Sequence, residues 1–184
     1  MKKRFINKSF LLKLLLTIVV LFLYSVGTKL KAQDKDYKAY SLFVYNFMKY
    51  TEWPEENSKG DFVLVIYGNS KIEKELKNLA AQKKLKGRNI QIKCLSNIDE
   101  SLDCNLIYIS DEKSQAVKDI ILRMKTKSVL IVGEREGLAS KGASLSFAEL
   151  ENDELSFDIN KKALEIHKLK ISSSLLKLGS VVVK

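Results

Sequence analysis

The sequence predicts a single α/β domain behind an N-terminal signal peptide: a largely parallel sheet flanked by helices, with a C-terminal hairpin and two closing helices. Three observations predict it. Residues 1–32 are cationic and then apolar, residues 33–184 alternate between helix-period and strand-period apolar patterns, and no Pro-rich, Ser-rich or repeated stretch divides them. With 184 residues, 46% of them hydrophobic, and one proline, the chain is long enough for one domain with its own core.

The leader, residues 1–32, has a cationic start, an uncharged apolar run over 14–28 and a small residue, Ala32, at its end. These are the parts of a secretory signal peptide, and cleavage is expected after Ala32. An uncleaved membrane anchor is the alternative, although the run is short against the roughly 20 residues that cross a bilayer. If the cationic end stays cytoplasmic, either outcome places residues 33–184 outside the cytoplasm.

The net charge of +10 at first suggests nucleic-acid binding, but the charge is concentrated in the leader. Residues 1–32 hold seven basic residues and no acid, so the remainder carries 25 basic and 22 acidic residues, a net charge of +3. The only basic cluster there has no aromatic neighbours in sequence for base stacking and is interpreted as a solvated loop: Lys83, Lys84, Lys86 and Arg88. The sequence therefore predicts no nucleic-acid partner.

The exported region begins with a predicted helix followed by a buried strand. Apolar residues over 40–48 recur at helical spacing, Asp36 is positioned to cap the helix start, and Trp53-Pro54 marks its end because the residue before proline leaves the helical region. Residues 62–67 are apolar at every position, which is typical of a strand covered on both faces.

Helices and strands then alternate. Ser70 to Glu73 has capping-box spacing for a second helix, and residues 90–94 alternate as a half-exposed strand. Further strands are expected at 104–109 and 128–132, separated by a helix for which Asp111 is the candidate cap. Such alternation needs crossover connections, which favours a parallel sheet.

The last third changes character. Residues 143–147 and 155–159 flank a polar loop and predict a hairpin at one sheet edge. Asn160 is a candidate cap for a helix through Ile166, and residues 172–174 begin a last leucine-rich helix. The β-branched tail 181–183 does not favour that helix, so it is expected to fray or to pack against another subunit.

Motifs for catalysis and cofactors are missing from the sequence. The turn Gly68-Asn69-Ser70 lacks the further glycines of a dinucleotide site, and residues 172–174 with His167 form no nucleophile elbow. His167 is instead interpreted as a surface histidine favoured by the dipole at a helix C-terminus. Acids such as Glu134 and Glu136 lie in expected loops, as on a solvated surface, although a carboxylate-dependent hydrolase stays open as a third hypothesis. No catalytic, cofactor or metal residue is therefore assigned.

Cys94 and Cys104 are the only two cysteines and lie ten positions apart in a compartment that permits oxidation. A disulfide between them is one interpretation. The other is that Cys104 is a small buried apolar residue, because a bridge requires Cα atoms within about 7 Å.

Ordered blocks of the chain resemble the YfiR family of bacterial periplasmic regulators. Residues 44–54 (VYNFMKYTEWP), 104–110 (CNLIYIS) and 129–134 (VLIVGE) resemble successive family blocks. The end, residues 155–160 (LSFDIN) followed by 169–178, resembles the family's strand end and closing leucine-rich helix. The resemblance spans about residues 37 to 180.

The resemblance implies a non-enzymatic exported α/β domain, residues 33–184, that controls a membrane signalling protein by binding its periplasmic part. Diguanylate cyclases, which make cyclic-di-GMP, are the partners it implies first, and a sensor kinase is equally compatible. A homodimer is also compatible with the family. Redox control is not carried over, because only Cys104 lies in a recognisable block.

Four residues form the predicted regulatory pocket or interface: Glu52, Trp53, Lys170 and Ser172. Trp53, next to a rigid proline, is either an interface anchor or part of the core. The other three come together if the end of the first helix meets the start of the last. A small ligand there would tune partner binding, and a periplasmic small-ligand-binding protein is the alternative function.

Overall fold

The computed structural model describes residues 9, 35–99, 102–149 and 154–183. The predicted signal peptide lies outside these residues apart from residue 9. The fold described below is that of residues 36–184, which form one compact unit. Within the described ranges, no helix has the length and apolar character needed to cross a membrane.

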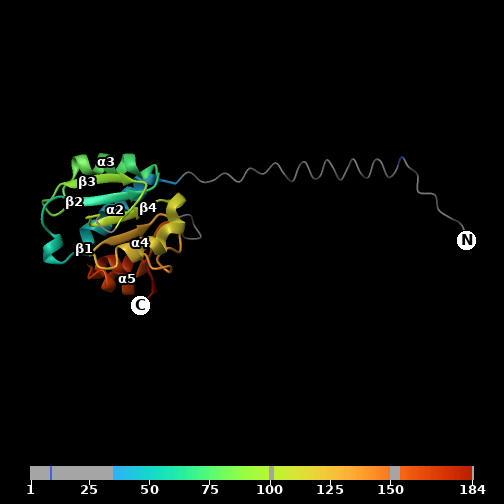
Figure 1. Cartoon of the computed structure of the whole chain (residues 1–184). Helices are drawn as coiled ribbons and strands as arrows, with labels where there is room; N and C mark the ends of the chain where they lie inside the picture. The colour runs from blue at the N-terminus through green and yellow to red at the C-terminus, as the bar shows by residue number, and fades with distance from the viewer. Residues whose placement is uncertain (1–8, 10–34, 100–101, 150–153, 184) are drawn as a thin grey trace, which may run out of the picture. The chain divides into compact units, whose positions relative to one another are not determined.

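The elements follow the predicted alternation (Figure 1). The first half contains α2 (Tyr37–Tyr50), β1 (Thr51–Glu52), the 3-10 helix η1 (Glu55–Asn57), β2 (Phe62–Tyr67), α3 (Ile72–Gln82), β3 (Ile90–Leu95) and β4 (Leu106–Ile109). The second half contains the 3-10 helix η2 (Asp111–Ala116), α4 (Val117–Arg123), β5 (Leu130–Gly133), β6 (Leu145–Glu149), β7 (Leu155–Asn160), α5 (Lys161–Ile166), β8 (Lys170–Ile171), α6 (Ser173–Leu178) and β9 (Ser180–Val183).

The described residues form a seven-stranded sheet in the order β3-β2-β4-β5-β6-β7-β9. Neighbouring strands run parallel except in the β6–β7 hairpin. The predicted α/β class and the mostly parallel sheet are therefore confirmed. A separate two-stranded ladder joins β1 to β8.

Helices cover both faces of the sheet, because β2, β4 and β5 are apolar at successive positions and must bury both sides. One core contains side chains of α2 and α3, among them Phe47 and Leu76, packed against Leu64 of β2. The other contains Val117 and Ile120 of α4, packed against alternate residues of β4 and β5. In Figure 1, α3 lies beside β3 and β2, on the opposite side of the drawing from α5.

Helix α2 begins as predicted: the Asp36 carboxylate accepts hydrogen bonds from the backbone N–H groups of Lys38 and Ala39, both at 3.1 Å. It ends at Tyr50, before Trp53-Pro54, because the chain enters β1 and pairs with β8. The helix therefore ends where the chain finds a strand partner in β8, three residues before Trp53, the residue that precedes the proline.

One predicted helix cap is confirmed in part and one is wrong. The Ser70 hydroxyl accepts from the backbone N–H of Ile72 at 3.4 Å at the start of α3, but Glu73 pairs with Lys77 instead of reaching back into a capping box. Asp111 caps no helix, because its carboxylate forms an ion pair with Arg135. By contrast, Asn160 caps α5 by accepting from the N–H of Ala163 at 2.8 Å, as predicted.

The tail of the chain is a strand. Residues 180–183 form β9, which runs parallel to β7 and, in place of the predicted hairpin, forms the edge of the sheet. Three consecutive valines favour an extended backbone, which explains why α6 ends at Leu178. The sequence argued against a helix here and predicted a frayed tail or a contact with another subunit. The tail instead pairs with β7 of the same chain.

Gly133, the last residue of β5, provides a test of packing. A Cβ added there would lie 2.6 Å from Leu138 Cδ1 and 2.7 Å from Leu138 Cβ. We expect Gly133→Ala to lower the free energy of unfolding by about 1–3 kcal/mol, measured by urea denaturation, because the buried Leu138 cannot move freely. Leu138→Ala removes the clashing Cδ1 and keeps Cβ, so it relieves part of the clash. Adding it should therefore cost less than the sum of the two single changes, and strict additivity would contradict this explanation.

Candidate functional site

The residues of the predicted pocket are brought together in part. Strands β1 and β8 are antiparallel, with Glu52 directly opposite Lys170. The backbone N–H of Ser172 donates to the carbonyl oxygen of Tyr50 at 2.9 Å. The end of the first helix therefore does meet the start of the last, but the Ser172 hydroxyl is occupied in capping α6 through the N–H of Leu175.

Trp53 is half-buried, between the two predicted roles. Its indole Nε1–H donates to the backbone oxygen of Asn105 at 3.3 Å. The indole meets the ring of Phe62 edge to face, with centroids 5.1 Å apart. Because Phe62 begins β2 and Asn105 precedes β4, Trp53 lies at the amino ends of these parallel strands.

A cavity of about 420 Å³ lies beside Trp53, and we call it the Trp53 cavity. It is lined by Met48, Glu52, Trp53, Ser58, Phe62, Leu85, Lys86 and Arg88. Glu52 and Trp53 of the predicted pocket belong to this lining, whereas Lys170 and Ser172 do not. Four of these eight lining residues are apolar, and small-molecule sites combine apolar walls with a few polar groups.

Arg88 builds one wall of the cavity and is not the solvated loop residue that the sequence suggested. Its guanidinium donates to the backbone oxygens of residues 57, 59, 60 and 61, at 2.7 to 3.2 Å, and to Asn105 Oδ1 at 3.4 Å. It also lies 5.4 Å from the ring centroid of Phe62. Burial lowers the pKa of Arg88, partly offset by Asp61. Arg88 thus ties the loop 57–61 to the sheet.

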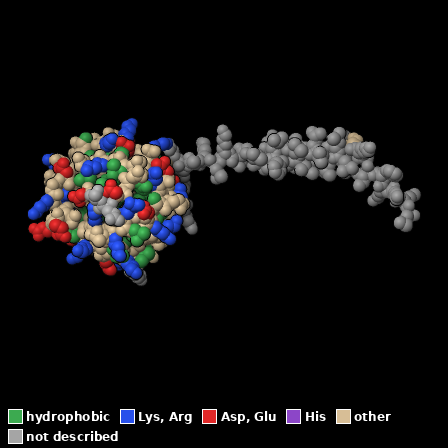
Figure 2. All heavy atoms as spheres, viewed as in Figure 1, with side chains coloured by type: hydrophobic (Ala, Val, Ile, Leu, Met, Phe, Trp, Pro, Cys, Tyr) green, Lys and Arg blue, Asp and Glu red, His purple; other side chains and the backbone are tan. Residues whose placement is uncertain are grey.

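The sequence missed Arg88 because its partners lie far away in the chain. The basic cluster has no aromatic residue nearby in sequence, yet Arg88 contacts Phe62 and Lys83 lies 5.1 Å from the ring centroid of Tyr45. The remaining surface agrees better with the small net charge of +3 counted for residues 33–184. Figure 2 shows Lys and Arg interspersed with Asp, Glu and neutral side chains on the face in view.

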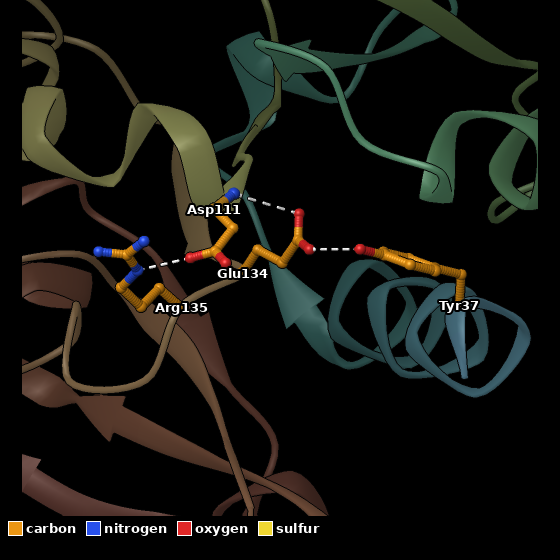
Figure 3. A network of polar contacts seen from close by, with 4 residues as sticks. All are labelled: Tyr37, Asp111, Glu134 and Arg135. Atoms are coloured by element: carbon orange, nitrogen blue, oxygen red, sulfur yellow. Dashed lines mark hydrogen bonds and ion pairs between the residues drawn. The ribbon is translucent and has the colours of Figure 1, made fainter. Parts of the chain in front are cut away.

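A second polar site, also missed, surrounds Glu134 at the carboxyl ends of β4 and β5 (Figure 3). The side chain is only 3% exposed, which corrects its assignment to a solvated loop. Its carboxylate accepts from the Tyr37 hydroxyl at 2.9 Å and from the backbone N–H of Asp111 at 3.3 Å. Asp111 is in turn paired with Arg135. This network joins the first turn of α2 to the ends of two strands.

Burial, followed by the hydrogen bond to Glu134, raises the pKa of Tyr37 to about 12. Tyr37 therefore remains a hydrogen-bond donor at physiological pH. Nearby, burial and then Glu134 raise the pKa of Tyr108 well above its usual value. The network can hold α2 against the sheet, but its tyrosines are poor proton donors or acceptors near neutral pH.

The predicted disulfide between Cys94 and Cys104 is not formed, because both thiols are free. Cys94 pairs with Ile66 of β2, whereas the register of β4 places Cys104 level with Phe62, four residues away along the same strand. At about 3.3 Å per residue this is roughly 13 Å, beyond the Cα separation of a disulfide. Burial raises the pKa of Cys104 to about 12, which suits the alternative of a buried apolar residue.

His167 is 2% exposed and donates from Nδ1 to the backbone oxygen of Lys127 at 2.7 Å. It is therefore a structural residue and not the surface histidine that the sequence suggested. Within the described ranges, no group of three or more His, Cys, Asp or Glu side chains could hold a metal ion.

Burial lowers the pKa of His167, partly offset by the bond to Lys127. The unfolded state, with a pKa of about 6.5, then binds the proton first as pH falls. We expect full stability above about pH 6.5 and a loss as pH falls from there toward the lower folded pKa. Urea unfolding between pH 7 and 6 isolates this effect, because His167 is the sole histidine. His167→Gln should flatten the dependence, and an unchanged slope would contradict the assignment.

A sequence profile of the YfiR/HmsC-like family matches residues 37–180. The chain belongs to this family. The family is one of periplasmic regulators, which supports a regulatory and non-enzymatic role for this chain. No curated protein matches it significantly in sequence.

Two solved structures share the fold. A conserved domain protein from Vibrio cholerae O1 biovar El Tor matches with a TM-score of 0.56 and 14% identity over 77% of this chain. A Streptococcus pneumonia "ABC domain in complex with L-Trp" matches with a TM-score of 0.52 and 11% identity over 75% of this chain. The chain covers 59% of each of those longer proteins. At these identities the likeness establishes the α/β fold alone.

Proposed function

We propose that this chain is exported to the periplasm, loses its signal peptide after Ala32, and binds the periplasmic part of a membrane signalling protein. A diguanylate cyclase, and hence cyclic-di-GMP signalling, is the first partner class, and a sensor kinase the second. The observation that carries the proposal is the match to a family of periplasmic regulators over residues 37–180, nearly the whole exported region. The cationic and apolar leader supports export.

A regulator of this kind acts without chemistry. It shifts its partner between two states only by as much as its affinities for those states differ, so a tenfold difference corresponds to about 1.4 kcal/mol. A rigid surface is sufficient for this, and the helices on both sheet faces provide one.

The proposal is tested in the native cell envelope by crosslinking an affinity-tagged chain and identifying the captured membrane proteins, with a parallel deletion strain. We expect capture of a cyclase or kinase, a changed cyclic-di-GMP level or kinase output on deletion, and a periplasmic protein whose N-terminus is Gln33. A cytoplasmic mature protein, or deletion without effect on either output, would reject the proposal.

A periplasmic small-ligand-binding protein is the second candidate function, favoured by the Trp53 cavity. The L-Trp complex reported for the Streptococcus structure shows a related fold with a small ligand bound, although the identity is too low to transfer that ligand. Thermal-shift screening against metabolites separates the candidates, because a ligand at 100 times its dissociation constant stabilises a protein by about 2.7 kcal/mol. Ligand binding without any signalling phenotype would favour this candidate over regulation.

A further inference from the structure

The two faces of the sheet carry different charges, which the net charge of +3 for residues 33–184 conceals. Helices α2, α3, α5 and α6 all contribute to the core on one face, whereas α4 contributes to the core on the other. We call the first group, with its caps and turns, the cationic helix layer: residues 36–52, 70–88 and 161–178. It carries 14 basic and 5 acidic residues, a net charge of +9, and the rest of residues 33–184 carries 11 basic and 17 acidic residues, a net charge of −6.

The basic side chains of the layer face solvent. Twelve of the 14 are exposed, and all twelve are lysines spread over the four helices and the turns beside them. Two of the acids are already engaged, because Asp36 caps α2 and Glu73 pairs with Lys77. The layer thus presents a broad positive field and not a single charged pocket.

The same layer holds most of the large apolar side chains that are exposed. Of the six such side chains in the described part of the chain, four belong to the layer and are 37% to 71% exposed: Leu42, Tyr50, Ile166 and Leu178. Helices α2 and α6, which carry three of these four, contact each other. Lysines together with exposed apolar side chains are typical of surfaces that lie on a lipid bilayer.

The type of basic residue favours a lipid surface over an acidic protein. Thirteen of the 14 are lysines, and the one arginine, Arg88, is engaged by backbone oxygens. Protein interfaces are depleted in lysine and enriched in arginine, because the planar guanidinium pairs with carboxylates in a fixed geometry. The charge of an anionic bilayer is diffuse and needs no such geometry, and each lysine near it strengthens binding about fivefold.

We propose that the cationic helix layer binds the anionic lipid headgroups of an envelope membrane, with its lysines at the phosphates and its exposed apolar side chains at the headgroup boundary. The proposal goes beyond the proposed function, because it states where the exported chain is held and not which protein it binds. A chain held on the membrane meets a membrane-embedded partner at a higher effective concentration than a free one.

Vesicle flotation tests the proposal with the mature protein, residues 33–184. The probes are phosphatidylcholine vesicles with no phosphatidylglycerol or with about 30% of this anionic lipid. We expect binding to the anionic vesicles at about 0.1 M salt and its loss at about 1 M salt, because the Debye length falls from about 10 Å to about 3 Å. Absence of binding to the anionic vesicles, or equal binding to both kinds, would overturn the proposal.

The decisive variant combines Lys38→Glu, Lys49→Glu and Lys83→Glu. Lys38 and Lys49 lie four residues before and seven after Leu42, on the same side of α2, and Lys83 lies 5.1 Å from the ring centroid of Tyr45 on that helix. All three lysines are exposed, so the fold should be kept. We expect binding to the anionic vesicles to weaken at least tenfold.

The matched control combines Lys118→Glu, Lys125→Glu and Lys141→Glu. These lysines are also exposed but lie outside the layer, so the control has the same net charge as the decisive variant. It should bind the anionic vesicles within about twofold of the parent, because its changes lie away from the lipid. An equal loss in both variants would show that total charge decides binding, and the role of the layer would be rejected.

Leu178→Ser and Leu122→Ser compare two leucines that are 71% and 70% exposed, the first in the layer on α6 and the second on α4. We expect Leu178→Ser to weaken vesicle binding about threefold or more, because it removes apolar area from the headgroup boundary, and Leu122→Ser to have no effect. Equal effects of the two changes would reject the contact of this layer with lipid.

The envelope crosslinking experiment separates this proposal from the regulatory one. Vesicle binding without capture of a signalling protein would support the lipid surface and reject the regulator. If the parent ignores anionic vesicles while the decisive variant loses its captured partner, the layer is a protein interface, the lipid proposal falls and the regulatory proposal stands.

Discussion

Phe147→Ala is expected to lower the free energy of unfolding by about 3–5 kcal/mol. Phe147 on β6 is 1% exposed and lies at the centre of an aromatic cluster. Its ring stacks on Tyr40, with centroids 4.2 Å apart, and meets Phe47 at 5.7 Å and Tyr108 at 6.4 Å. Truncation removes a ring that joins α2 to the middle of the sheet, and the surrounding rings cannot collapse fully into the space.

Urea unfolding measured by circular dichroism checks this value, with Leu122→Ala as the control. Leu122 is 70% exposed on α4, so its truncation should change the unfolding free energy by no more than about 0.5 kcal/mol. Similar effects for the two variants would show that the aromatic cluster is not the main contact between α2 and the sheet.

Arg88→Met is expected to cost about 2–4 kcal/mol and to free the loop that forms the wall of the Trp53 cavity. The variant keeps an apolar side chain against Phe62 but removes the donors to the oxygens of residues 57–61. These acceptors lose their partner together. The bonds to Asn57 and Asn105 are half-buried and the other three are exposed, and bonds to a charged group contribute about 1.5–3 kcal/mol each without being additive. Hydrogen exchange should accelerate in residues 57–61.

Arg123→Met is the matched control. Arg123 pairs with Asp119 one turn away on α4, and both side chains are largely exposed. Such a surface pair contributes about 0.3–0.5 kcal/mol, so its loss should be hard to detect. If Arg88→Met were equally silent in unfolding and in hydrogen exchange, Arg88 would not be the residue that anchors the loop.

Local patterns in the sequence predicted most of the elements, because each depends on neighbours within a few residues. The apolar run 62–67 coincides with β2, and Asp36 and Asn160 cap α2 and α5. The valines at 181–183 likewise predicted that the last helix would not continue through the tail. The structure places these residues in β9.

The candidate site depended on contacts that no local pattern contains. Trp53 and Glu52 were predicted from their own positions, next to Pro54 and at a helix end. Lys86 and Arg88 seemed to be part of a solvated basic loop, because their partners lie 17 to 35 positions away in sequence. Glu134 seemed exposed because an acid in a loop usually is, whereas its partners in the structure include Tyr37, 97 positions away, and the backbone N–H of Asp111, 23 positions away.

The sequence by itself determined the class of the fold and the order of strands and helices along the chain, because apolar periodicity and helix capping depend on residues a few positions apart. Ordered sequence blocks also indicated the family. The tertiary structure decided which polar side chains are buried, that Cys94 and Cys104 stay apart, and where a cavity opens. Those outcomes depend on which strands become neighbours in the sheet. Neighbouring strands bring together residues that are far apart in the sequence, and no local sequence pattern reveals that these residues will be in contact.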